Sequence, residues 1–167
     1  MKAKAVFLDR DGVLNVDVAY LYKVSDLRWI DGAKEALAYL NTQGYKLFVV
    51  TNQSGIARGY YTVDDMNTLH NHMQAELNQC GAKIEKFYYC PHHPKGALPE
   101  YTMECSCRKP QPGMILRAFA EYDIDKAQSF LIGDKDSDLE AAANAGIEGY
   151  KFTGGNLLEF VKNILKG

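Results

Sequence analysis

The 167-residue sequence lacks any long uninterrupted run of hydrophobic residues, and no window approaches the ~18 consecutive apolar residues of a membrane-spanning helix. It also lacks an excess of charge of one sign, since 19 lysines and arginines face 21 aspartates and glutamates and the formal net charge is −2. There is no basic stripe, so we do not expect nucleic acid to be a partner. The sequence therefore excludes a helical membrane protein, and we expect no membrane association.

We also expect no N-terminal targeting segment. Residues 1–4 lead directly into an apolar strand candidate, without the apolar region or the small-residue cleavage site of a signal peptide. We therefore expect a cytoplasmic protein. The sequence has no internal repeat, low-complexity tract or linker, so we expect one domain over residues 1–167, long enough to bury a substantial core. Since no long exposed apolar face demands a partner, we expect a monomer.

Apolar runs alternate along the chain with amphipathic segments in β-α-β order. Three of these runs, VFL, KLFVV and SFLI, are continuous rather than alternating, which is typical of a parallel sheet covered on both faces. The sequence predicts an α/β protein, a three-layer α/β/α sandwich around a mostly parallel, doubly wound (Rossmann-like) sheet. The expected strands are 5–8, 46–50, 84–89, 129–132 and 149–152, and the expected helices are 32–43, 63–80, 112–122, 137–145 and 156–166.

Two connections, residues 16–30 and 91–110, are too long for simple turns between these elements. Long irregular loops in compact domains are usually functional. Neither segment is long enough to form a separate cap domain. We therefore expect a functional site that is roofed by loops alone.

Polar and charged side chains gather after three of the expected strands. Asp9 and Asp11 follow the first strand, residues 51–54 follow the second, and the acidic segment 133–138 follows the fourth. Alone, the D-x-D-G pattern could be an ordinary Asp-rich turn. Because the carboxyl ends of parallel strands meet at one edge of a sheet, however, these groups should converge there with the cations of residues 108–109. Carboxylate oxygens suit a hard cation such as Mg²⁺, which binds few protein carboxylates together with water and phosphate.

The four cysteines are unevenly placed along the chain. Cys80 stands alone at the end of a helical pattern, and we expect it to be a small buried hydrophobic residue. The other three cluster with histidine in the patterns C-P-H-H-P and C-S-C, which in a reducing compartment favours metal binding over disulfides. Three thiolates and one imidazole form the closed tetrahedral set of a structural zinc site, although unrelated buried cysteines are the alternative. The expected ligands of this zinc-stabilised loop (90–107) are Cys90, His92, Cys105 and Cys107.

Four stretches of the chain, FLDRDGVLN, VVTNQ, RKP and IGDKDSD, resemble the four motifs of the haloacid dehalogenase superfamily of phosphatases, in the same order and over most of the length. Within that superfamily, three further patterns resemble the phosphatases that remove the 7-phosphate of D-glycero-D-manno-heptose 1,7-bisphosphate. They are NVD…Y in Asn15–Tyr20, TNQSGIARG in Thr51–Gly59, and CPHHP followed by C-x-CRKP. The family's C-x-H ligand position falls on His92, so we expect His93 to lie outside the zinc site.

The resemblance implies a role for each catalytic group. Asp9 would be the nucleophile that forms an aspartyl-phosphate, and Asp11 would protonate the leaving alkoxide and then deprotonate water. Mg²⁺ would be held by Asp9, the backbone carbonyl of Asp11 and Asp134. Thr51 and Lys109 would bind the phosphoryl oxygens in the transition state.

The resemblance also implies that the substrate is a small phosphorylated sugar. Its product would be used to make the heptose precursors of cell-surface lipopolysaccharide. Arg108 would bind the sugar or its second phosphate, where a planar guanidinium suits bidentate recognition. Asp138 could be a helix N-terminal charge, but we favour a role in which it orients the Mg²⁺ site from outside. Further candidates for substrate binding are Asp17, Tyr20, Asn52, Gln53, Ser54 and Lys135.

Two other functions remain open from the sequence. Histidinol-phosphate phosphatases share the zinc loop and the RKP motif, and a catalytically silent α/β binding module is a reading of a different class. The second possibility is disfavoured, because a binding module does not need all five of the residues Asp9, Asp11, Thr51, Lys109 and Asp134. His70 and His72 lie in a polar helical stretch, and we expect both to be surface residues outside the site.

Overall fold

The protein is a parallel five-stranded sheet with helices on both faces, and the computed structural model describes residues 2–167. The strand order is β3-β2-β1-β4-β5, so the chain starts in the middle of the sheet and winds outward in both directions. The strands are β1 (Lys4–Leu8), β2 (Tyr45–Asn52), β3 (Lys86–Cys90), β4 (Phe130–Gly133) and β5 (Glu148–Lys151). The helices are α1 (Ala33–Thr42), α2 (Ser54–Ala57), α3 (Val63–Gln79), α4 (Gly113–Glu121), α5 (Asp136–Ala145) and α6 (Leu157–Lys166).

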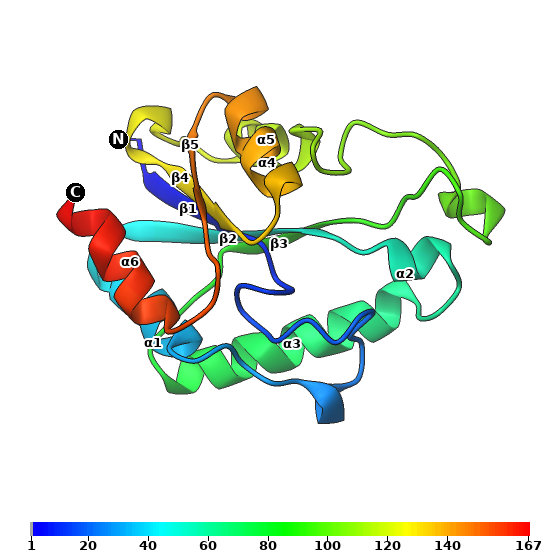
Figure 1. Cartoon of the computed structure of the whole chain (residues 1–167), viewed down its shortest axis with the longest axis horizontal. Coiled ribbons are helices and arrows are strands. Elements are labelled where there is room, and N and C mark those ends of the chain that lie inside the picture. Colours follow the sequence, from blue (N-terminus) through cyan, green and yellow to red (C-terminus); the bar gives the residue numbers. More distant parts are fainter. Residues whose placement is uncertain (1) are drawn as a thin grey trace.

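The helices form two layers, with α4 and α5 on one side of the sheet and α1, α3 and α6 on the other (Figure 1). Alternate strand residues serve the two layers: Val6 and Leu8 of β1 pack in the core under α1, α3 and α6. Ala5 and Phe7 pack in the core under α4 and α5. This double burial is why the strand sequences are continuously apolar, and it confirms the predicted three-layer α/β/α sandwich with a doubly wound sheet.

The five expected strands and five long helices are all present, with ends displaced by one or two residues. The short helix α2 and three 3-10 turns (Val24–Asp26, Pro99–Tyr101 and Lys126–Gln128) were not expected. Within α2, a Cβ on Gly55 would lie 2.2 Å from the ring of Tyr61. Glycine is required there because the Tyr61 ring packs directly on the helix backbone.

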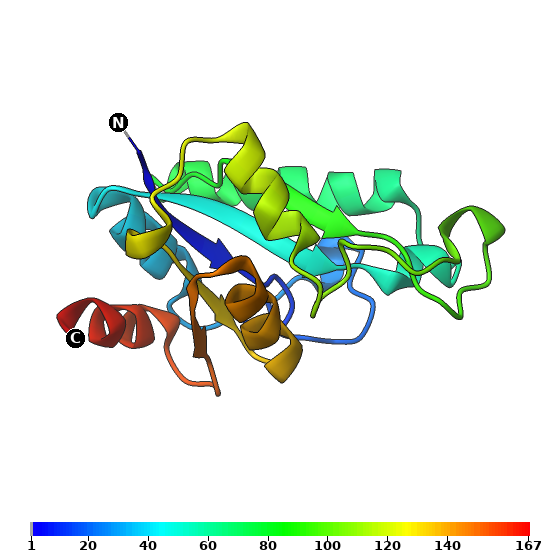
Figure 2. The ribbon, with the colours of Figure 1, turned by 90° about the horizontal axis from the view of Figure 1, so that it is seen from above.

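Long loops cover the carboxyl ends of the strands, whereas both chain ends lie at the opposite end of the molecule (Figures 1 and 2). The loop of residues 16–30 is held at its base, where Val16 donates to the Arg28 carbonyl at 2.8 Å. The loop after β3 extends beyond α2 and is fastened there, since Ala97 and Leu98 both donate to the carbonyl of Ala57. As predicted, loops roof this edge of the sheet. Among residues 2–167, no helix is long and apolar enough to cross a membrane.

Two predictions about single residues are wrong. His70 is buried, because it falls on the same face of α3 as the buried residues Met66, Met73 and Leu77. This face carries the i, i+4, i+7 spacing of an apolar stripe. Cys80 is exposed rather than buried, and it lies just after Gln79, the last residue of α3.

Candidate active site and metal centre

A cleft of about 770 Å³ opens at the carboxyl edge of the sheet. Its walls come from the ends of β1 and β2, from both long loops and from the N-terminal end of α5. This convergence follows from the fold, because parallel strands bring all of their carboxyl ends to one edge. Most of the predicted site residues line the cleft, namely Asp9, Asp11, Asp17, Tyr20, Asn52, Gln53, Ser54, Arg108, Lys109, Lys135 and Asp138.

Two predicted residues, Thr51 and Asp134, lie close to the cleft but do not line it. Thr51 is fully buried at the end of β2, where its Oγ1 accepts a hydrogen bond from Gln53 Nε2 at 2.9 Å. Asp134 is half-buried in the turn between β4 and α5, beneath Gly12. A Cβ on Gly12 would lie 2.0 Å from Asp134 Oδ2, and Gly12 has a φ of +88°, so only glycine fits between the turn after β1 and Asp134.

Three carboxylates and one buried cation lie at the floor of the cleft or directly beside it. Oxygens of Asp9, Asp134 and Asp138 all lie within 4.8 Å of one another. Lys109 Nζ lies 3.0 Å from Asp9 Oδ1 and 2.6 Å from Asp138 Oδ1, and it donates to the Val50 carbonyl at 2.9 Å. One lysine thus compensates part of the charge of a buried acidic cluster.

Burial controls the pKa values in this cluster. It raises the pKa of Asp9 well above its ordinary value, although the Lys109 charge opposes the shift. Burial likewise raises the pKa of Asp134. For Lys109, burial lowers the pKa, but the neighbouring carboxylates of Asp9 and Asp138 outweigh it and raise the value. A further positive charge beside these two carboxyl groups would oppose the effect of burial and favour their ionised forms.

This charge deficit fits a divalent cation. Asp134 Oδ1 is buried and has no hydrogen-bond partner, so it is available as a ligand. Hard oxygen ligands on Asp9 and Asp134 match the preference of Mg²⁺. Asp138 is satisfied differently: its Oδ2 accepts from the backbone N–H groups of Asp134 and Lys135 at 3.1 and 3.2 Å. Asp138 thereby holds the turn that presents Asp134.

Asp11 is held by three side chains, two from the turn after β1 and one from the end of β2. Its Oδ1 accepts from Arg10 Nη2 at 2.8 Å, from Arg10 Nε at 3.2 Å and from Asn15 Nδ2 at 3.0 Å. Its Oδ2 accepts from Gln53 Nε2 at 3.3 Å. The Tyr61 hydroxyl donates to Gln53 Oε1, which fixes the amide with its nitrogen toward Asp11. Burial raises the pKa of Tyr61, so that this hydroxyl keeps its proton.

The side chain of Asn52 binds the backbone of Lys109 through two hydrogen bonds. Its side chain donates to the Lys109 carbonyl at 3.3 Å and accepts from the Lys109 backbone N–H at 3.0 Å. The two bonds fix the backbone from which the Lys109 ammonium reaches the cluster. The sequence suggested substrate binding for Asn52, and this clamp on Lys109 was not expected.

The sequence interpretation did not identify Arg10, His70 or Tyr61 as parts of the site. Arg10 has the largest fully buried side chain among residues 2–167, and it donates to His70 Nε2 from Nη1 at 3.1 Å. The available signals were weak ones. An arginine between two apolar-flanked aspartates suggests a buried, paired cation, and His70 lies on the apolar stripe of α3.

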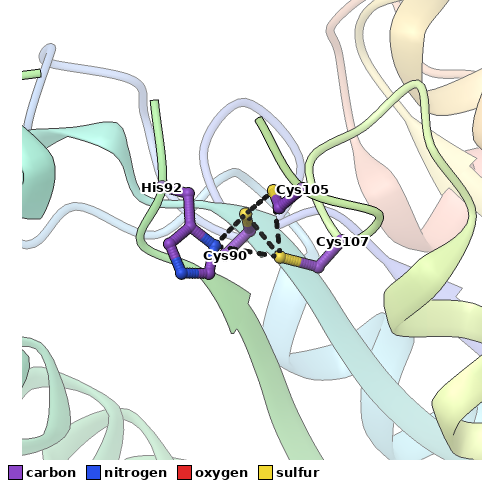
Figure 3. Close-up of side chains that lie close together, drawn as sticks. All are labelled: Cys90, His92, Cys105 and Cys107. Atoms are coloured by element: carbon purple, nitrogen blue, oxygen red, sulfur yellow. Dashed lines mark hydrogen bonds between the residues drawn. The ribbon is translucent and has the colours of Figure 1, made fainter. Parts of the chain in front are cut away.

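A second cluster lies beside the cleft, at the end of β3, and contains the four predicted zinc ligands (Figure 3). Cys90 Sγ lies 3.4 Å from Cys105 Sγ and 2.7 Å from Cys107 Sγ. His92 Nδ1 lies 3.6 Å from Cys90 Sγ and 3.4 Å from Cys107 Sγ. Three sulfurs and one imidazole nitrogen around a common centre match the donor set of a closed, tetrahedral zinc site. His93 lies outside the cluster and contacts Arg58, as expected.

The cysteine cluster is coupled to the cleft by neighbours in the sheet and in the sequence. Cys90 pairs with Asn52 in the register of β3 and β2, and its carbonyl accepts from the Gln53 N–H at 2.8 Å. Cys107 directly precedes Arg108 and Lys109. A metal in this cluster would therefore hold Arg108 and Lys109 close to the end of the sheet.

Sequence models of one hydrolase family match both halves of the chain. A model described as haloacid dehalogenase-like hydrolase matches residues 6–86, and a model described as HAD-hydrolase-like matches residues 106–157. These segments contain Asp9, Asp11, Thr51, Lys109 and Asp134. The chain belongs to the haloacid dehalogenase-like hydrolases, and the family resemblance predicted from its motifs is confirmed.

Curated relatives carry a more specific name. The chain is 47% identical over 161 residues to D-glycero-beta-D-manno-heptose-1,7-bisphosphate 7-phosphatase from Rhodopseudomonas palustris, covering 96% of this chain and 89% of that protein. It is 48% identical to the protein of the same name from Pasteurella multocida, covering 87% and 78%.

Solved structures of two related enzymes have the same fold. The D,D-heptose 1,7-bisphosphate phosphatase of B. bronchiseptica, complexed with magnesium and phosphate, superposes with a TM-score of 0.81 at 34% identity, covering 98% of this chain and 87% of that one. The enzyme of Burkholderia thailandensis gives a TM-score of 0.67 at 26% identity, covering 98% and 99%. Because this chain belongs to a family of hydrolases, the binding-module reading loses its support.

Proposed function

We propose that this protein removes the 7-phosphate of D-glycero-D-manno-heptose 1,7-bisphosphate through an aspartyl-phosphate on Asp9. The observation that carries the proposal is the charge pattern of the cleft floor. Asp9 lies at the end of β1 in contact with Lys109, beside two further carboxylates, in an open cleft. The 47% identity to a named heptose bisphosphate phosphatase supports the choice of substrate.

In the first step, an oxygen of Asp9 bonds to phosphorus as the bond from phosphorus to the sugar oxygen breaks. Asp11 gives its proton to the departing alkoxide. The Lys109 ammonium, 3.0 Å from Asp9 Oδ1, stabilises the charge that gathers on the phosphoryl oxygens. Thr51 is proposed to donate its hydroxyl to the same phosphoryl group, since Gln53 already donates to its oxygen.

In the second step, water attacks phosphorus of the aspartyl-phosphate and Asp11 takes the proton. The bond from phosphorus to Asp9 breaks, inorganic phosphate leaves, and Asp9 is free again. Asp11 therefore acts first as an acid and then as a base, a cycle that returns its proton.

Asp9, Asp134 and the backbone carbonyl of Asp11 are the proposed Mg²⁺ ligands. When bound, Mg²⁺ supplies positive charge that neutralises nucleophile and phosphate. The relative from B. bronchiseptica was solved with magnesium and phosphate, which supports the choice of ion. We further propose that Cys90, His92, Cys105 and Cys107 bind a structural Zn²⁺.

The substrate is proposed to be held through its second phosphate and its hydroxyls. Arg108 lines the cleft, and its Nη1 is buried without a partner, so it can donate to an anionic group. Lys135 adds a second cation to the lining of the cleft. Asp17, Tyr20 and Ser54 also line the cleft and are proposed to contact the sugar.

Steady-state hydrolysis tests the substrate. With Mg²⁺ present, we expect the highest kcat/KM on the heptose 1,7-bisphosphate, compared with fructose 1,6-bisphosphate and histidinol phosphate. Product analysis should show loss of the 7-phosphate alone. Faster turnover of histidinol phosphate would replace the proposed substrate, and no turnover of any phosphate ester would overturn the phosphatase proposal.

Asp9→Asn tests the nucleophile. Because the amide cannot form the phosphoryl intermediate, turnover should fall by at least about 10³-fold. The fold should persist, since the substitution is nearly isosteric and removes a buried charge. Asp64→Asn is the matched control, an exposed carboxylate of α3 that does not line the cleft. Retained activity in Asp9→Asn would show that another group attacks.

A further inference from the structure

The two oxygens of the Asp11 carboxylate have different surroundings. Oδ1 accepts three hydrogen bonds, two from Arg10 and one from Asn15, at 2.8 to 3.2 Å. Oδ2 accepts one longer bond, 3.3 Å from Gln53. Three donors occupy Oδ1, so a proton on this carboxyl group resides on Oδ2. The oxygen that exchanges the proton is thereby selected by the neighbours of the other oxygen.

Arg10 performs most of this selection, and it does so from a fully buried position. Its Nη2 also donates to the Leu21 carbonyl at 3.1 Å, which joins the loop of residues 16–30 to the site. Its Nη1 donates to His70 Nε2 at 3.1 Å. A guanidinium has only donors, so the orientation of its plane depends on acceptors at both ends.

His70 provides the acceptor on the side away from Asp11. Since Arg10 can only donate, His70 Nε2 must carry a lone pair, which places the ring proton on Nδ1. The ring stacks on Phe87 of β3, with centroids 4.3 Å apart and planes at 16°, so both α3 and the sheet hold it. Burial, assisted by the Arg10 charge, lowers the pKa of His70 to about 3, so the imidazole stays neutral.

We propose that His70 and Arg10 are positioning residues for the acid–base step: His70 orients the Arg10 guanidinium, which occupies Asp11 Oδ1 and leaves Oδ2 to deliver the proton to the leaving alkoxide. This inference rests on the proposed function of Asp11. It assigns a role in the reaction to a residue of α3, which does not line the cleft. It also explains why the Arg10 guanidinium is buried between the Asp11 carboxylate and the His70 ring.

The test compares two leaving groups. A sugar alkoxide needs a proton to depart, whereas the p-nitrophenolate of p-nitrophenyl phosphate leaves as a stable anion. His70→Phe keeps the ring on Phe87 but removes the acceptor. It should lower kcat/KM for the heptose bisphosphate about tenfold or more, and for p-nitrophenyl phosphate by less than about threefold. Arg10→Lys, which cannot reach both Asp11 and His70, should show the same selective loss.

Two further variants serve as rescue and control. His70→Gln retains a side-chain acceptor and should recover most of the activity on the heptose bisphosphate. His72→Phe changes a partly exposed histidine of the same helix, which pairs with Glu76, and should behave as the wild type on both substrates. Nitrogen NMR of the wild-type protein should show the His70 proton on Nδ1, a readout that does not depend on the folding of any variant.

The outcomes separate the two proposals. An equal loss on both substrates in His70→Phe, no loss in it, or a proton on His70 Nε2 would overturn the positioning role while leaving the phosphatase intact. Failure of the wild type to hydrolyse either ester would overturn the proposed function, and the positioning role with it.

Discussion

Lys109 organises the acidic floor of the cleft. Its side chain is buried and its ammonium contacts two carboxylates and one backbone carbonyl. Such a cation compensates the charge of Asp138, and it places positive charge where we propose that a phosphoryl group binds. Removing one partner of a buried ion pair is costly because the other charge stays buried.

Lys109→Met should therefore damage both stability and turnover. The loss of the ammonium leaves Asp9 and Asp138 uncompensated, so we expect a free energy of unfolding lower by about 3–5 kcal/mol in the absence of divalent cations. Turnover should fall by about 10²-fold or more. Urea unfolding and steady-state assays measure the two effects. Lys135→Met, an exposed lysine of the same cleft, should leave stability near that of the wild type.

The neutral imidazole of His70 links the stability of the fold to pH. Its pKa is lowered to about 3 by burial, whereas the unfolded chain has the ordinary value of 6.5. Below pH 6.5 the unfolded state binds a proton that the folded state does not, so the free energy of unfolding falls as the pH falls. Each pH unit changes the free energy of unfolding by about 1.36 kcal/mol. Between pH 6.5 and about 5, the free energy of unfolding should therefore fall by about 2 kcal/mol.

Denaturation at several pH values should show this slope in the wild type and in His72→Phe. In His70→Phe the corresponding part of the slope should disappear, because the titrating group is gone. If His70→Phe kept the full pH dependence of the free energy of unfolding, His70 would have to be protonated in the folded protein as readily as in the unfolded chain.

The loop between β3 and α4 depends on the four-residue cysteine and histidine cluster. Residues 95–104 contain few apolar side chains, and backbone bonds to Ala57 fasten the middle of the loop to α2. The cluster closes the base of the loop, from Cys90 at the strand end to Cys107 before the cleft cations. Closing a loop in this way restricts the unfolded state and fixes the groups at both ends.

Cys107→Ser should lose the metal and loosen the loop. We expect the zinc content to fall, backbone hydrogen exchange to rise in residues 91–106, and KM for the heptose bisphosphate to increase because Arg108 and Lys109 are no longer held in place. Cys80→Ser is the matched control, an exposed thiol outside the cluster. Unchanged metal content and kinetics in Cys107→Ser would remove the zinc account of this loop.

The cleft joins parts of the chain that are far apart in sequence, and a cation would join them further. Asp9 follows β1, Asp134 follows β4, and Lys109 arrives from the loop after β3. A ligand that binds only the folded arrangement stabilises it by mass action. The raised pKa values of Asp9 and Asp134 also mean that bound protons compete with a metal.

Mg²⁺ should raise the melting temperature of the wild-type protein. A concentration of 100 times Kd corresponds to about 2.7 kcal/mol of added stability, and the effect should weaken as the pH falls because protons displace the metal. Asp134→Asn should abolish the stabilisation. Asp136→Asn, an exposed carboxylate paired with Lys151, should retain it. Equal stabilisation of both variants would place the ion elsewhere.

Much of this architecture is readable in the order of residues alone. Continuous apolar runs predict buried parallel strands, and polar residues at the strand ends predict where the cleft lies. Asp9, Asp11, Lys109 and the cysteine motif were predicted because strand ends and short ligand spacings are local patterns. The substrate-binding roles of Asp17, Tyr20 and Ser54 stay predictions, as do those of the other cleft residues.

Contacts between distant segments were not predictable in the same way. The Arg10–His70 bond joins residues 60 apart, and the Asn52–Lys109 bonds join residues 57 apart. Whether His70 faces the core or Cys80 faces solvent depends on where α3 lies and ends. The positions of Asp9 and Asp11 thus follow from local sequence, because a strand and a turn present them. Which donors bind each carboxylate oxygen depends on how α3, the sheet and the loops pack together, because those donors come from segments that only folding brings into contact.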